Sequence, residues 1–285
     1  LRIPSRWLEE LHLAAGRPRF LEAISNNPKQ AAFVADPSDR KTALCGRRGG
    51  KTTGIAGWLY GGMIEKPGTR QVYIALTRGL ARQILWDNVL LKMARDYGLP
   101  IRETTRDGHL LIQHSNGSSI WITGCDDKRE VDKFRGQPFF RANIDEAQGF
   151  PDDVLQLLVE DALEPALADY GGQIALTGTP SPIDIGYFHS ATTGLAPGWS
   201  CGHHWDVMDN PFFLRQRAKD QERFANRAVE FLASGIEKHG SAEHPTYRRE
   251  YLGKWTHDVS ALVYPLGYDN AWIPDGLGPF GLPEG

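Results

Sequence analysis

The sequence has few cysteines and no long apolar run, and both absences exclude classes of protein. Its three cysteines, Cys45, Cys125 and Cys201, are far apart and odd in number, which argues against a disulfide framework and favours a reducing, intracellular setting. No apolar run approaches the ~20 residues that a membrane-spanning helix needs. The first ten residues mix Arg and Glu with apolar positions, unlike a secretory leader. We therefore expect no membrane partner.

A basic excess is also absent. The chain has 32 Lys and Arg against 35 Asp and Glu, a formal net charge of -3. A protein that grips duplex DNA over a broad face usually carries a basic excess. If this chain handles DNA, we expect a few local contacts, or one of several subunits that each contribute little.

What the sequence does contain is an alternation of strand-like and helix-like segments. Buried strands are predicted at residues 42–45, 72–76, 139–144 and 173–176, and helices at residues 51–64, 80–97 and 151–170. The last helix is expected to be interrupted near Pro165. Two more strands, at residues 109–114 and 119–123, flank Asn116-Gly117, a hairpin signal because both residues tolerate positive φ. This order predicts an α/β fold with a mainly parallel central sheet covered by helices.

The chain is expected to divide into a core at residues 1–198, a small helical subdomain at residues 199–257 and a linker at residues 258–285. Two short amphipathic helices are predicted at residues 6–15 and 17–24, followed by a loop at residues 26–39 that contains two prolines. The helical subdomain is strongly charged, with helices at residues 210–234 and 242–252. Because the chain starts with Leu and ends in a Gly/Pro-rich stretch, we expect it to be part of a longer protein.

A glycine-rich segment, Cys-Gly-Arg-Arg-Gly-Gly-Lys-Thr at residues 45–52, follows the first strand and leads into a helix. Glycines let backbone N–H groups turn toward phosphate oxygens, and the positive end of the following helix points at them. Lys51 would reach the β- and γ-phosphates, and the Thr52 hydroxyl would contact Mg²⁺. Cys45 stands where the usual pattern has its first glycine, so the alternative is a plain glycine-rich turn with a basic patch. The predicted nucleotide-binding residues of this loop are Gly46, Arg47, Arg48, Gly49, Gly50, Lys51, Thr52 and Thr53.

Asp145 and Glu146 end a strand downstream of this loop. An Asp at the end of a buried strand can hold the ligand shell of Mg²⁺, and the adjacent Glu can polarise an attacking water. Taken alone, the pair is also typical of a helix start, since helix N-termini favour acidic residues. Together with Lys51 and Thr52, the pair predicts a P-loop ATP hydrolase.

Several segments, in this order along the chain, resemble those of viral terminase large subunits from tailed bacteriophages. Arginines precede the Gly-Gly-Lys-Thr of the glycine-rich loop, and Lys-Phe-Arg-Gly at residues 133–136 precedes the acidic strand. Leu-Thr-Gly-Thr-Pro at residues 176–180 is similar to the family's coupling motif. Asp-Asn-Pro at residues 209–211 and Arg-Glu-Tyr-Leu-Gly-Lys-Trp at residues 249–255 are similar to signatures of its helical lid. The resemblance spans residues 28–255 and implies a RecA-like P-loop NTPase core with a small helical lid.

The resemblance also implies roles for residues outside the loop. Gln30 would hydrogen-bond the edge of adenine, and the alternative is a surface loop residue. Thr177, Gly178 and Thr179 end a strand beside Asp145, where they would sense phosphate loss and pass it to the lid. The alternative for these three is a plain strand-to-loop turn.

By the same resemblance, Arg135 would reach a neighbouring subunit's nucleotide as a trans-acting arginine finger, which stabilises the charge that builds in the transition state. The alternative is a solvated arginine after a helix. Arg47, Arg48 and Arg141 are further candidates for this role.

The function implied is the ATPase motor of a DNA-packaging terminase, which uses ATP and Mg²⁺ to move double-stranded DNA into a procapsid. Its partners would be double-stranded DNA, the portal protein, the small terminase subunit and copies of itself in a ring formed on the procapsid. It would work in the host cell cytoplasm, transiently at the portal vertex. Such terminases usually carry a second, nuclease domain that holds two metals. Because few residues follow Trp255, we expect no nuclease activity in this chain.

Two other functions fit parts of the pattern. Asp-Glu-Ala-Gln at residues 145–148 and Thr-Gly-Thr at residues 177–179 also suit half of a DEAD-box-like nucleic-acid helicase. Such enzymes need a second RecA-like domain, and no series of strands and helices follows residue 200. A non-hydrolysing ATP-binding structural subunit is the other alternative. Glu146 counts against it, because a binding module has no use for a water-activating carboxylate.

Overall fold

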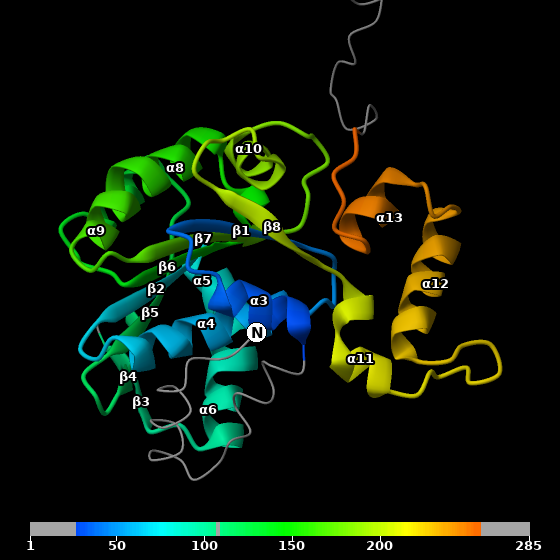
Figure 1. Ribbon diagram of the computed structural model, residues 1–285, viewed down its shortest axis with the longest axis horizontal. Helices are drawn as coiled ribbons and strands as arrows, with labels where there is room; N and C mark the ends of the chain where they lie inside the picture. The colour runs from blue at the N-terminus through cyan, green and yellow to red at the C-terminus, as the bar shows by residue number, and fades with distance from the viewer. Residues whose placement is uncertain (1–26, 107–108, 258–285) are drawn as a thin grey trace, which may run out of the picture.

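The computed structural model describes residues 27–106 and 109–257 (Figure 1). The helices predicted at residues 6–15 and 17–24 and the linker predicted at residues 258–285 lie outside these ranges. No helix within the described ranges is both long and apolar enough to cross a membrane.

The described residues contain one eight-stranded sheet with the strand order β3-β4-β5-β2-β6-β7-β1-β8. The strands are β1 Arg40–Cys45, β2 Arg70–Ala75, β3 Ile101–Arg106, β4 His109–His114, β5 Ser119–Gly124, β6 Arg141–Asp145, β7 Gln173–Gly178 and β8 Ser200–Trp205. The pairs from β5 through β2, β6, β7 and β1 to β8 are parallel, whereas β3-β4 and β4-β5 are antiparallel. The prediction of an α/β fold with a mainly parallel sheet is confirmed.

The hairpin predicted around Asn116-Gly117 joins β4 and β5. Gly117 has φ of 86°, and the Asn116 Oδ1 accepts a hydrogen bond from the Ser118 backbone N–H at 3.0 Å. Strand β3 was not expected. Its sequence, Ile-Arg-Glu-Thr-Thr-Arg, is mostly polar, as suits an edge strand that must not pair with other chains.

Helices cover both faces of the sheet, as predicted (Figure 1). On one face lie α4 (Lys51–Glu65) and the continuous helical stretch of α5 (Arg78–Ala81), η1 (Arg82–Leu90) and α6 (Leu91–Tyr97). On the other lie α8 (Asp152–Gln156), η4 (Leu157–Leu163), α9 (Glu164–Ala168) and α10 (Tyr187–Thr193). The helices predicted at residues 80–97 and 151–170 are confirmed, each with a π-helical central section. The second changes register just before Pro165, which has no N–H to continue the ladder.

Each face of the sheet has its own hydrophobic core, because successive strand residues point to opposite sides. Tyr73 of β2 packs with Trp58 and Leu85 on the face of α4. Its neighbours Val72 and Ile74 pack with the aromatic and aliphatic side chains on the face of α8. The two cores hold the central strands rigidly, so that side chains at the ends of these strands have fixed positions.

Residues Pro28–Ala35 form helix α3, and the prediction of a loop at residues 26–39 is wrong here. The Asn27 Oδ1 accepts hydrogen bonds from the backbone N–H groups of Lys29 and Gln30, at 3.1 and 3.2 Å. Pro28 lies at the first helical position, where its missing N–H costs nothing. The proline taken for a breaker therefore starts a helix, and Phe33 anchors that helix against Trp58.

The region after residue 198 begins with an unexpected strand. Strand β8 pairs in parallel with β1 and completes the sheet, although only its last residue, Trp205, is buried. The single helix predicted at residues 210–234 is wrong: α11 (Pro211–Arg215) and α12 (Arg227–His239) are separate, and Asn226 caps the second. Helices α11, α12 and α13 (Pro245–Glu250) form a group beside the sheet (Figure 1). The division into a core and a lid remains a prediction, with β8 on the side of the core.

The cap of α3 generates a stability prediction. Asn27→Ala removes the acceptor for two N–H groups and is expected to lower the free energy of unfolding by about 1 kcal/mol. Asn27→Ser keeps a capping oxygen and should lose no more than a few tenths of a kcal/mol. Urea unfolding followed by circular dichroism measures both variants, and equal losses in the two would mean that capping is not what Asn27 contributes.

Candidate active site

The glycine-rich loop lies between β1 and α4, as predicted. Arg48 and Gly50 have positive φ, 63° and 90°, and Gly50 is the residue that precedes α4. Alternating handedness of this kind turns successive backbone N–H groups toward one concave side, which favours anions. The first N–H groups of α4, including those of Lys51 and Thr52, have no acceptors within the helix. They carry the positive end of the helix dipole, which lies at the same concave side of the loop.

Residues far along the chain hold the outer side of the loop. The Arg47 backbone N–H donates to the Glu250 carbonyl at 2.6 Å, and the two side chains form an ion pair. The Asn210 Nδ2 donates to the Arg48 carbonyl at 2.7 Å. Gly46 is required here, because a Cβ on it would lie 2.2 Å from the carbonyl oxygen of Tyr251. The loop therefore touches the segments that lead into and out of the helical group α11–α13.

Gln30 reaches the loop from α3. Its side chain is buried, and its Nε2 donates to the Gly50 carbonyl at 2.8 Å. A Cβ on Gly50 would lie 2.5 Å from this Nε2 and would displace the Gln30 amide, and the φ of 90° at Gly50 itself favours glycine. The fold thus brings the predicted adenine-binding residue and the predicted phosphate loop into contact.

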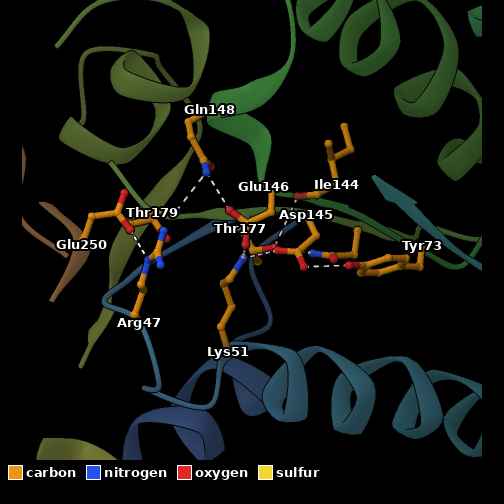
Figure 2. Close-up of polar contacts among 11 residues, drawn as sticks. Arg47, Lys51, Tyr73, Ile144, Asp145, Glu146, Gln148, Thr177, Thr179 and Glu250 are labelled. Atoms are coloured by element: carbon orange, nitrogen blue, oxygen red, sulfur yellow. Dashed lines mark hydrogen bonds and ion pairs between the residues drawn. The ribbon is translucent and has the colours of Figure 1, made fainter. Parts of the chain in front are cut away.

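The acidic pair lies at the carboxyl end of β6, directly opposite the loop (Figure 2). Asp145 is fully buried. Its Oδ2 accepts a hydrogen bond from the Tyr73 hydroxyl at 2.7 Å, and its Oδ1 accepts one from the Thr177 hydroxyl at 2.8 Å. Tyr73 and Thr177 come from β2 and β7, the strands on either side of β6, so the sheet itself holds this carboxylate in one orientation.

Lys51 contacts both carboxylates. Its Nζ donates to Asp145 Oδ1 and to Glu146 Oε1, the latter at 2.6 Å. Burial by itself would lower the pKa of Lys51, but the charges of Asp145 and Glu146 raise it above its usual value. The lysine is therefore cationic at neutral pH, and it joins the loop to the acidic strand end.

Glu146 has a left-handed backbone, with φ of 51°. This conformation is uncommon for a residue other than glycine and stores strain. The Glu146 side chain is 32% exposed, unlike that of its buried neighbour Asp145. Its Oε2 accepts a hydrogen bond from Gln148 Nε2 at 2.6 Å. The turn thus sends the two adjacent carboxylates to different environments, one in the core and one at the surface of the site.

The predicted coupling residues lie beside this pair. Thr177 contacts Asp145 as described, and the Thr179 backbone N–H donates to Gln148 Oε1 at 3.3 Å. Neither Tyr73 nor Gln148 was predicted as a site residue. The sequence does not reveal which side chain Tyr73 contacts, because that depends on the register of β2 against β6. Gln148 lies two residues after Glu146, outside the acidic motif itself.

The arginines proposed as fingers have different environments. Arg135 is 47% exposed, and its Nε donates to Asp132 Oδ1 at 3.0 Å. Arg141 is buried, forms an ion pair with Glu65 at 2.5 Å, and has its pKa lowered by burial to about 10. Its role is in the core, because strand alternation points it at α4, and this removes it from the candidates. Arg47 is exposed and pairs with Glu250.

The Tyr73 contact generates a second prediction. Tyr73→Phe leaves a buried, charged oxygen of Asp145 without one donor and is expected to lower the free energy of unfolding by about 2 kcal/mol. Tyr60→Phe is the matched control, because the Tyr60 hydroxyl donates to the neutral Leu90 carbonyl at 3.0 Å; its loss should be about 1 kcal/mol. Urea denaturation at neutral pH compares them. A smaller loss for Tyr73→Phe than for Tyr60→Phe would contradict a charged acceptor at Asp145.

Comparison with known proteins gives a family match over part of the chain. Residues 42–163 match the family described as terminase large subunit, T4likevirus-type, N-terminal. This segment contains the glycine-rich loop and the acidic pair. No curated protein matches the chain in sequence.

Several solved structures share the fold. The large terminase ATPase domain of Thermus phage P74-26 is 19% identical with a TM-score of 0.60, over 85% of this chain and 99% of that domain. The large terminase of a thermophilic bacteriophage, solved in complex with ADP, is 16% identical with a TM-score of 0.61, over 81% of this chain and 53% of that protein. The HK97 bacteriophage large terminase is 18% identical with a TM-score of 0.55, over 84% of this chain and 50% of that protein.

The chain thus spans the whole of one isolated ATPase domain and about half the length of two larger terminases. Fold and motif agree, since the segment matched by the family is the one that carries Lys51, Asp145 and Glu146. The fold is therefore that of phage large-terminase ATPase domains, and residues 42–163 are similar to the N-terminal part of the T4-like terminase large subunit family.

Proposed function

We propose that this chain hydrolyses ATP at the site between the glycine-rich loop and β6, and that hydrolysis drives double-stranded DNA into a procapsid. One observation carries the proposal. Lys51, at the start of α4, contacts both Asp145 and Glu146 at the carboxyl end of a parallel strand, which is where open α/β sheets bind their ligands. The similarity to a large terminase ATPase domain and to a large terminase solved with ADP supports the choice of ATP.

The loop would bind the phosphates. The backbone N–H groups of residues 46–50 and the start of α4 would face the phosphate oxygens, with Thr53 on the first turn. The Lys51 ammonium forms ion pairs with Asp145 and Glu146 in this structure. With ATP bound, it would also reach the β- and γ-phosphates. Gln30 donates its Nε2 to Gly50, and we assign its other polar atom, Oε1, to the exocyclic amine of adenine.

The residues present fit a magnesium ion. Asp145 supplies a buried carboxylate and Thr52 a hydroxyl on the first turn of α4, and Mg²⁺ prefers such oxygen ligands. When bound, Mg²⁺ would supply positive charge to the phosphate oxygens. Tyr73 and Thr177 would keep Asp145 oriented toward it, by the hydrogen bonds that they already donate.

Glu146 would act as the base. Its left-handed backbone and partial exposure place its carboxylate outside the core, at the open side of the site. There it would accept a proton from the attacking water, while Asp145 stays buried and held by Tyr73 and Thr177. Lys51 would balance the charge that moves onto the phosphate oxygens. The two adjacent carboxylates would therefore have two roles, which their environments separate.

We assign the trans-acting finger to Arg135. Its side chain is about half exposed, and among the described residues its partners are Asp132 at the surface and the Asp161 carbonyl, so it can turn to contact a neighbouring copy. A ring of copies on the procapsid, with the portal protein and the small terminase subunit, would then complete each site. Release of phosphate would be passed through Thr177, Gly178 and Thr179 toward the helical group α11–α13. We retain the expectation that this chain has no nuclease activity.

The role of Glu146 is tested by phosphate release from ATP in the presence of Mg²⁺. Glu146→Gln is expected to lower kcat at least about 100-fold, because the variant cannot accept a proton. Binding of ATP-γ-S should remain. Glu243→Gln, a matched change at a surface glutamate that pairs with Arg248, should hydrolyse at the wild-type rate. Hydrolysis by Glu146→Gln at that rate would contradict the proposed mechanism.

The trans position of Arg135 is tested by mixing variants. Arg135→Ala and Glu146→Ala should each be inactive, whereas a 1:1 mixture should recover about a quarter of the wild-type rate, because one in four neighbour pairs combines an intact base with an intact finger. The rate per subunit of the wild type should rise with protein concentration. Arg129→Ala, at an exposed arginine of the preceding helix, is the control. No recovery in the mixture, together with a concentration-independent wild-type rate, would exclude a finger supplied in trans.

A further inference from the structure

Gln148 makes two contacts that the proposed mechanism does not use. Its Nε2 donates to Glu146 Oε2 at 2.6 Å, and its Oε1 accepts from the Thr179 backbone N–H at 3.3 Å (Figure 2). The orientation of the amide is unambiguous, because a carboxylate only accepts and a backbone N–H only donates. The side chain therefore bridges the end of β6 and the end of β7.

The backbone holds Gln148 firmly in this place. It is the middle residue of the short 3-10 turn Ala147–Gly149 that follows Glu146. The Gly149 N–H donates to the Glu146 carbonyl at 2.8 Å, and the Phe150 N–H donates to the Ala147 carbonyl at 3.3 Å. Ala147 and Phe150 are both buried. The turn is therefore anchored on both sides, and it is the side chain of Gln148 that can respond to its partners.

The coupling segment is built to let this side chain approach. A Cβ on Gly178 would lie 2.2 Å from Gln148 Oε1, which is closer than any real contact. Only glycine at this position leaves room for the bridge to Thr179. The same glycine was predicted to belong to the coupling segment, and the approach of Gln148 gives a physical reason for it.

We propose that Gln148 is a positioning residue that fixes the direction of the Glu146 carboxylate and makes it sensitive to the position of Thr179. Lys51 holds one oxygen of Glu146 and Gln148 holds the other. When Lys51 turns to the phosphates of ATP, Gln148 is the contact that keeps the carboxylate aimed at the water. A shift of Thr179 would move the amide and with it the base. The inference rests on the proposed function, since it assigns a task only if Glu146 acts in hydrolysis.

An open pocket of about 530 Å³ beside Gln148 gives the amide space to move. Its lining includes Phe150, Ile183, Phe188 and Trp255, which come from the turn, from the loop after β7, from α10 and from the chain beyond α13. The bridge therefore lies where segments on both sides of the coupling residues meet.

The test measures ATP hydrolysis and ATP-γ-S binding by the full chain. Gln148→Ala should lower kcat about tenfold or more, because misplacing a catalytic group is costly, and should leave KM and ATP-γ-S affinity within about twofold. Gln156→Ala is the matched control, since the Gln156 amide also donates to a glutamate, Glu160, at 3.1 Å but away from the site. It should match the wild type in every measurement.

Two further variants separate positioning from a merely structural role. In Gln148→Glu, the introduced carboxyl can donate to Glu146 only while protonated, so its kcat relative to wild type should fall as pH rises. Gly178→Ala should lower kcat as Gln148→Ala does, and the double variant should be no worse than Gln148→Ala alone. Melting temperatures establish that each variant is folded.

The outcomes distinguish the two proposals. If the wild type hydrolyses ATP but Gln148→Ala keeps its kcat, the positioning role is wrong and the ATPase function stands. The same conclusion follows if Gln148→Glu has the pH profile of the wild type, or if Gly178→Ala is equally harmful in both backgrounds. If the wild type itself does not hydrolyse ATP at any concentration, the proposed function fails and this inference fails with it.

Discussion

A carboxylate buried in a protein core must be surrounded by donors, because the loss of water costs several kcal/mol that only hydrogen bonds and opposite charge can offset. Asp145 is such a group. Tyr73 and Thr177 donate to it from the two neighbouring strands, and Lys51 brings positive charge from the start of α4. Three elements around β6 therefore supply the hydrogen bonds and the positive charge that the Asp145 carboxylate needs. The order β2-β6-β7 places the two donors, and the glycine-rich loop places the lysine.

The backbone after Asp145 then makes the next residue different. Glu146 is held in a left-handed conformation, which turns its side chain away from the core in which its neighbour is buried. Two carboxylates that are adjacent in sequence therefore differ in exposure and in partners. The strain of that turn is held by packing on both sides, since Ala147 and Phe150 are buried among residues of α8 and η4. A site that needs one fixed and one accessible carboxylate obtains both from a single strand end.

Local sequence patterns were enough to find the loop, the acidic pair and most of the sheet, because strand-loop-helix order and buried apolar runs are local properties. Contacts between distant segments were not accessible in this way. Tyr73 and Gln148 find their partners only through strand register and turn geometry. The sequence did not predict the helix at Pro28–Ala35. Proline breaks a helix when it lies in the interior, but it is favoured at the first position of a helix, where Pro28 lies. The stretch before Asn226 is rich in helix-forming residues, but Asn226 caps a new helix. The backbone N–H groups of Lys219 and Asp220 donate to the Glu230 carboxylate of that helix, and these contacts override the propensity.

Contacts between distant segments also connect the glycine-rich loop to the helical group α11–α13. Arg47 is tied to Glu250 through backbone and side chain, Arg48 is tied to Asn210, and Gly46 lies against the Tyr251 carbonyl. A loop of small residues has little packing of its own, so its shape depends on these partners. Any rearrangement of the loop around phosphate must therefore be accommodated by the segments at both ends of α11–α13. The glycine-rich loop is therefore in direct contact with the segments that lead into and out of the helical group α11–α13.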